Sequence, residues 1–113
     1  MGDGTINEKR LYTRVQSNLS VLVYYNKRLI STCTCKNISI GGMVLESEDL
    51  GLSVNSLIDI KFDVDEKYQL YNVIIPAIVK RIGNGQIALA FEMLEKATEQ
   101  IIQQELVTRL GYN

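Results

Sequence analysis

The sequence predicts a mainly-β fold, a small antiparallel barrel followed by one C-terminal helix, and three observations carry that prediction. Apolar and polar residues alternate in several short segments between residues 19 and 93. Turn-forming residues separate these segments, most clearly at Gly83-Asn84-Gly85. The apolar spacing becomes helical only after Glu95. About six strands at short intervals with tight turns are typical of a small antiparallel barrel.

The elements follow in order along the chain. We expect residues 1–14 to form an irregular, flexible arm because they show no apolar period, and residues 15–113 to form the barrel with its helix as one domain. A first strand over 19–24 precedes a hairpin turn at Asn26-Lys27-Arg28. The remaining expected elements are strands over 29–36, 43–45, 57–64, 71–82 and 86–93 and a helix over 95–110. Pro76 implies an edge position, a bulge or a strand start.

Composition narrows the function classes. The chain has 113 residues, is 46% hydrophobic and carries a formal net charge of −1. Because the chain has no surplus of basic residues, its charge argues against a protein that binds long DNA or RNA through counterion release. The sequence shows no signal peptide and no apolar run long enough to span a bilayer, so we expect no membrane insertion. Cys33 and Cys35 would share one strand face about 7 Å apart, which predicts free thiols and a cytoplasmic protein.

Two short segments carry the chemistry that points to a ligand. Lys9 and Arg10 begin the first, and Arg14 follows Arg10 by four residues. Guanidinium groups match phosphate oxygens and the O6/N7 edge of guanine. The second segment, Asn37-Ile38-Ser39-Ile40-Gly41-Gly42, places short polar side chains before a glycine turn that suits close approach of a nucleotide. The two segments together suggest a phosphorylated, guanine-bearing ligand.

The spacings Arg10-x-x-x-Arg14 and Asn37-x-Ser39-x-x-Gly42 resemble the RxxxR and [D/N]xSxxG signatures of the PilZ domain, a bacterial receptor module for cyclic di-GMP. The segment 85–91 is similar to the closing strand of that family, which tends to carry a Gly and a Phe. The resemblance implies a six-stranded antiparallel barrel with a C-terminal helix and the ligand on its outer surface. It also implies a downstream protein partner.

The resemblance further implies the roles of individual residues. Arg10 and Arg14 would hold phosphates and guanine edges from the N-terminal arm, and Asn37, Ser39 and Gly42 would contact the ligand from the barrel wall. Lys9, where many relatives have arginine, bears on whether one cyclic di-GMP or a stacked pair binds, and the stoichiometry stays open. Gly41 would also bind the ligand at this turn, and Gly42 would leave room for the ligand or supply an unusual backbone angle.

A non-catalytic receptor is the favoured interpretation. The chain has no histidine, the commonest general base, and shows no nucleophile motif, phosphate loop or metal cluster, so we expect no enzyme, metal or cofactor. One alternative is a PilZ-like module that binds proteins and no nucleotide, and another is a small nucleic-acid-binding barrel. Taken separately, the two motifs could be solvated arginines and an ordinary turn. The chain would be a monomer or a weak dimer.

Overall fold

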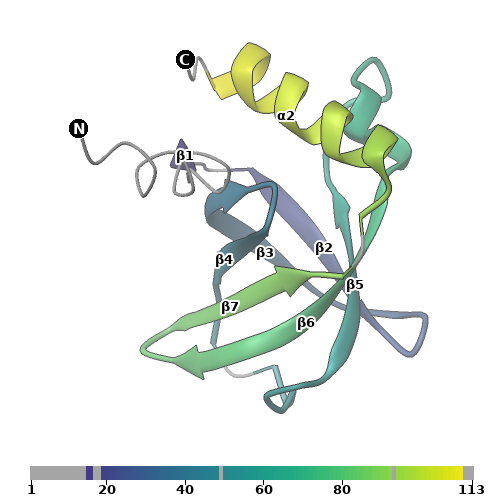
Figure 1. The fold of residues 1–113 in the computed structure, drawn as a ribbon. Helices are drawn as coiled ribbons and strands as arrows, with labels where there is room; N and C mark the ends of the chain where they lie inside the picture. The colour runs from purple at the N-terminus through teal and green to yellow at the C-terminus, as the bar shows by residue number, and fades with distance from the viewer. Residues whose placement is uncertain (1–14, 17–18, 49, 93, 111–113) are drawn as a thin grey trace.

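Six antiparallel strands close into a barrel in the computed structural model, which describes residues 15–16, 19–48, 50–92 and 94–110 (Figure 1). The barrel strands are β2 (Ser20–Tyr25), β3 (Arg28–Ser39), β4 (Gly42–Glu46), β5 (Leu57–Phe62), β6 (Ile74–Gly83) and β7 (Gln86–Phe91). They pair in the order β3-β2-β5-β6-β7-β4, and a further pairing of β3 with β4 closes the ring. The predicted barrel is confirmed.

A short additional strand, β1 (Val15–Gln16), lies outside the ring and pairs with the last part of β3. Val15 stands opposite Ile38, and Gln16 stands opposite Asn37. The sequence did not predict β1, because two residues are too few to show an alternating period. The predicted arm, residues 1–14, lies outside the described residues.

Two hairpin turns form where turn residues predict them. Asn26 and Lys27 have φ angles of 51° and 66°, so both adopt the left-handed conformation that a tight hairpin between β2 and β3 requires. Asn84 and Gly85, with φ angles of 57° and 73°, connect β6 to β7 in the same way. Arg28 belongs to β3, so the first turn is one residue shorter than predicted.

The core fills the barrel with side chains from alternate positions of its strands. In β5, Ile58, Ile60 and Phe62 point inward, as the alternation predicts, and each is at most 3% exposed. Burial of an aliphatic or aromatic side chain of this size contributes about 1.5–3 kcal/mol. The other buried hydrophobic members of the main cluster are Val21, Val23, Cys33, Cys35, Ile38, Met43, Leu45, Leu70, Ile75, Ala77, Val79, Ile87, Leu89 and Ile102.

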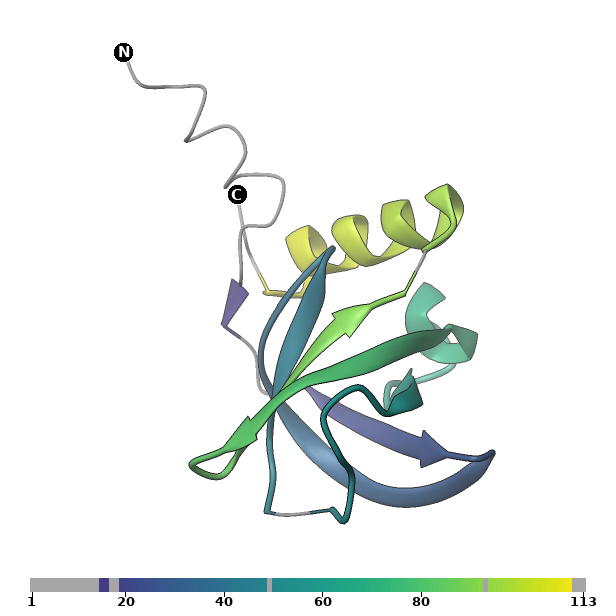
Figure 2. The same ribbon diagram turned by 60° about the horizontal axis from the view of Figure 1, so that its bottom comes forward.

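The helix α2 (Lys96–Leu110) lies across one end of the barrel, where it contacts β1 and the 3₁₀ helix η1 (Gln69–Asn72) (Figures 1 and 2). Ile102 of α2 and Leu70 of η1 are fully buried at this end. The helix prediction is confirmed, whereas the extended stretch predicted from residue 71 begins later, because Tyr71 and Asn72 complete η1. No helix in the described part of the chain is long and apolar enough to cross a membrane.

Pro76 lies near the start of β6, which agrees with one of the three predicted explanations. Its carbonyl accepts a hydrogen bond from the Glu92 N–H at 2.8 Å, one position beyond the ladder that pairs Ala77 with Phe91. Pro76 therefore cannot return a hydrogen bond to Glu92, and the regular β6–β7 ladder ends at this point.

Replacement of Ile60 by alanine should lower the free energy of unfolding by about 2–5 kcal/mol, because it leaves a cavity in the packed barrel. Ile74→Ala is the matched control, since that side chain is 61% exposed on the neighbouring strand. We expect the control to change stability by less than about 0.5 kcal/mol. Urea denaturation at low micromolar protein concentration measures both, and equal effects would contradict the assigned inward face of β5.

Candidate functional site

A β-bulge sets the orientation of the second motif at the end of β3. The β3–β4 register shifts between Cys35 and Asn37, so Lys36 is the extra residue. Cys35 points into the core before the bulge and Ile38 does so after it. Because strand side chains alternate, the extra residue turns Asn37 to the outer face, whereas strict alternation would have placed it inward. The Asn37 side chain is half-buried there.

The backbone at Asn37 is held from both sides. Gln16 of β1 stands opposite it on one side, and Val44 of β4 stands opposite it on the other. The Cys35 thiol also donates a hydrogen bond to the Asn37 carbonyl at 3.3 Å. Asn37 therefore presents its amide from a rigid three-strand segment, which lowers the entropic cost of ligand binding.

Ser39 stabilises the turn between β3 and β4. Its side chain is almost fully buried, at 2% exposed, and its Oγ accepts a hydrogen bond from the Gly41 N–H at 3.1 Å. A hydroxyl that accepts one hydrogen bond still has its own proton to donate and a second lone pair. The Ser39 hydroxyl therefore acts first on its own turn, and a ligand contact would come in addition.

Gly42 is required by the close approach of β4 to β7. A Cβ atom at this position would overlap the carbonyl oxygen of Leu89 and lie 3.2 Å from the Cα of Ala90. The carbonyl of Gly41 accepts a hydrogen bond from the Phe91 N–H at 2.9 Å and ties the same turn to β7. The expectation of an unusual backbone angle at Gly42 is wrong, because its φ lies outside the left-handed region.

The first motif residues, Lys9, Arg10 and Arg14, lie outside the described residues. The strand β1 begins directly after Arg14, and its pairing places Val15 opposite Ile38, in the middle of the second motif. The two residues that follow the first motif are therefore paired with the strand of the second, although more than twenty residues separate the two motifs in sequence.

Lys36 is a cation beside the motif that the sequence analysis overlooked. The bulge exposes it immediately before Asn37, and its Nζ lies 3.9 Å from a carboxylate oxygen of Glu46 on β4. Both side chains are exposed, at 44% and 58%, so the ion pair contributes at most about 1 kcal/mol of stability. Either side chain can therefore turn to another charged group. In the sequence, the only signal for Lys36 is its position directly after the alternating Cys33 and Cys35, whose side chains point inward.

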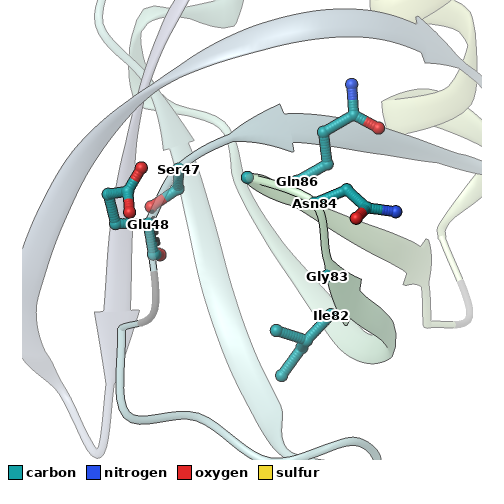
Figure 3. A pocket seen from close by; sticks show the side chains of 7 residues that line it. Ser47, Glu48, Ile82, Gly83, Asn84 and Gln86 are labelled. Carbon is teal, nitrogen blue, oxygen red and sulfur yellow. Dashed lines mark hydrogen bonds between the residues drawn. The ribbon is translucent and has the colours of Figure 1, made fainter.

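A hollow of about 200 Å³ lies at the far end of β4 from the motif (Figure 3). Figure 3 shows Ser47 and Glu48 on one side and Asn84 and Gln86 of the β6–β7 hairpin on the other. The β4–β7 register pairs Glu46 with Gln86 at this end and Gly42 with Ala90 at the other. The described members of the predicted ligand set, Asn37, Ser39, Gly41 and Gly42, therefore do not line this hollow. Within the described ranges no group of three metal-ligating side chains converges.

Comparison with known proteins agrees with this geometry. The family model described as the PilZ domain matches residues 8–107, which includes both motifs. No curated protein matches the chain.

Several solved structures share the fold. The PilZ domain of CeSA from a cellulose-synthesising bacterium is 22% identical, with a TM-score of 0.65 over 88% of this chain and 98% of that one. MrkH of K. pneumonia in its apo state is 20% identical, with a TM-score of 0.61 over 88% of this chain and 49% of MrkH. This chain thus spans about half of MrkH. The uncharacterised Legionella protein Lpg0364 is 13% identical, with a TM-score of 0.55 over 90% of this chain and all of that one.

Replacement of Gly42 by alanine should lower the free energy of unfolding by about 1–3 kcal/mol or more, because the added methyl group forces β4 away from the backbone of β7. Gly85→Asn is a useful control. Gly85 has a φ of 73° and open space around its Cβ position, and asparagine tolerates that conformation. Thermal denaturation of both variants separates a steric requirement from a conformational one, and a Gly42→Ala variant as stable as the control would contradict the close approach.

Replacement of Ser39 by alanine should cost about 1–3 kcal/mol of stability, because it removes the hydroxyl that accepts the Gly41 N–H. Ser31→Ala, on the same strand and partly exposed, should change stability by less than about 0.5 kcal/mol. Denaturant titration compares the two variants. A neutral Ser39→Ala change would show that the turn does not depend on this hydrogen bond.

Proposed function

This chain belongs to the PilZ domain family, and we propose that it is a bacterial cyclic di-GMP receptor that signals to a partner protein. The observation that carries the proposal is the pairing of β1 with β3. It joins the segment that follows Arg14 to the strand that presents Asn37, which supports a site in which both halves of the family signature take part.

Chain connectivity limits how far the two arginines can lie from Asn37. Val15 follows Arg10 by five positions, and a fully extended chain covers at most about 18 Å over that span. The Cα atom of Arg14 lies about 3.8 Å from that of Val15, whose partner is Ile38. Arginine side chains reach several ångströms further, so both guanidinium groups can contact a nucleotide that lies on Asn37.

The chemistry of the region suits a cyclic dinucleotide. Each guanidinium group can form two parallel hydrogen bonds to a phosphate or stack on a guanine, and Lys9 can add a point charge. The Asn37 amide can both donate to and accept from a guanine edge. Ser39, Gly41 and Gly42 complete the barrel wall by holding the turn beside this amide. The formal net charge of −1 is consistent with cations that act locally on a small anion.

The proposed mechanism is closure of the N-terminal arm over the bound nucleotide. Ordering the arm costs free energy, and charge-assisted hydrogen bonds to the phosphates must exceed that cost. The closed arm would lie next to β1 and α2 and form a surface that a partner protein recognises. Ligand binding would thus shift the population of the chain toward the conformation that the partner binds. PilZ domains are generally binding and regulatory modules, and no catalytic step is part of the proposal. Two free, buried cysteines support a reducing, cytoplasmic location.

Arg10→Ala and Arg14→Ala should each weaken cyclic di-GMP binding by about 1.5–3 kcal/mol for every charged hydrogen bond removed, which is roughly 10- to 150-fold in the dissociation constant. Arg28→Ala is the matched control, because that exposed arginine begins β3, about 30 Å along the strand from Asn37. Isothermal titration calorimetry measures the affinity, and the stoichiometry then shows whether one nucleotide or a stacked pair binds.

Two outcomes would overturn the proposal. Wild-type protein that binds no cyclic di-GMP would make the chain a protein-interaction module that has lost the nucleotide. Binding that survives both arginine substitutions would place the nucleotide elsewhere on the barrel. Circular dichroism of the two variants should match the wild type, since both residues precede the first described strand.

A further inference from the structure

The outer surface formed by β2, β5 and β6 is unusually apolar. Cross-strand partners form three rows on it, namely Leu22–Lys61–Ile74, Tyr24–Asp59–Pro76 and Leu57–Ile78. We call these eight residues the β5 face. Six of the eight side chains are apolar or aromatic, and Leu57 and Ile74 are each 61% exposed. The outward side of an antiparallel sheet is normally polar, so an apolar outer face of this kind is suited to contact with another protein surface.

The two charged side chains of the β5 face are adjacent positions on the outward side of its central strand. Asp59 and Lys61 are both half-buried, and the structure gives neither an ion-pair partner within the described part of the chain. The Lys61 ammonium lies 5.5 Å from the centre of the Tyr71 ring. An open hollow of about 280 Å³ over them is lined by Tyr24, Lys27, Asp59, Lys61 and Ile74. The eight residues of the β5 face thus combine apolar surface with one acid and one base, and Lys27 lines the same hollow.

This pattern is complementary to itself. Two such faces can pack against each other about a two-fold axis that lies between them, at right angles to β5 and level with Ile60. This axis places β5 antiparallel to β5 of the second copy and keeps β2 opposite β2 and β6 opposite β6. The row of Asp59 in one copy then faces the row of Lys61 in the other. Asp59 meets Lys61, Leu22 meets Tyr24, and Ile74 meets Pro76, each of them twice. Sheet faces pack about 10 Å apart with strands within about 30° of alignment, which this arrangement allows.

From this geometry we infer that the β5 face is an interface between two copies of this chain, held by reciprocal Asp59–Lys61 pairs within an apolar surround. Another protein would need its own acid, base and apolar groups at the same spacings, whereas a second copy already provides them. The face spans only three strands of a curved barrel, so we expect a weak dimer at the small end of known interface sizes.

The interface leaves the candidate nucleotide site accessible. In the ring of six strands, β5 stands three places from β4 in both directions, through β2 and β3 or through β6 and β7. The β3–β4 turn with Ser39 and Gly42 is therefore on the opposite side of the barrel. The dimer does not depend on nucleotide binding, and each property can be measured without the other.

Charge exchange at two positions tests the interface. Asp59→Lys places lysine opposite Lys61 of the second copy, and Lys61→Asp places aspartate opposite Asp59. Each variant alone should weaken the dimer by about tenfold or more, because like charges face each other twice. An equimolar mixture of the two variants should recover a dissociation constant close to that of the wild type, because every facing pair is again opposite in charge. Sedimentation velocity over a concentration series measures all four samples.

Glu48→Lys changes the net charge as Asp59→Lys does, on an exposed residue after β4, and should leave the dimer unchanged. A wild-type chain that stays monomeric at about 1 mM, a dimer that tolerates both single changes, or a mixture that fails to associate would each overturn the inference. Recovery of the dimer in the mixture also shows that both variants are folded.

Discussion

The close approach of β4 to β7 at Gly42 is the constraint on which the barrel depends. β4 lies between β7 and β3 in the ring, so it must come within pairing distance of both for the sheet to close. Any side chain at Gly42 would meet the backbone of Leu89, and the Gly41 carbonyl bonds to β7 at the same point. The glycine that resembles part of a ligand motif is thus first a requirement of barrel closure, and the turn that it begins positions the candidate site.

The bulge at Lys36 connects core packing to the candidate site. Before it, the cysteines of β3 point inward, and after it Ile38 takes the inward position. A regular strand would have buried the Asn37 amide in an apolar interior, where an unpaired polar group costs about 1–3 kcal/mol. The extra residue avoids that cost and places the amide on the surface next to β1. The same irregularity therefore serves stability and the proposed nucleotide contact.

The alternation in β5 and the helical spacing after Glu95 were enough to predict the barrel and α2, because burial of one face leaves a period in the residues themselves. The two motifs identified the family, and the family model confirms it. The sequence did not predict β1, η1 or the bulge at Lys36. A two-residue strand, a single 3₁₀ turn and a bulge leave no period because each spans too few residues to repeat a pattern.

The sequence by itself determined the fold class, the family and the residue types available to bind a phosphorylated ligand, because periodicity and motif spacing are local properties of the chain. Only the tertiary structure decided that β1, directly after Arg14, pairs with the strand of the second motif, that Gly42 faces β7, and that apolar residues of β2 and β6 flank Asp59 and Lys61. These features arise from strand register, which pairs residues far apart in sequence and cannot be read from either strand alone.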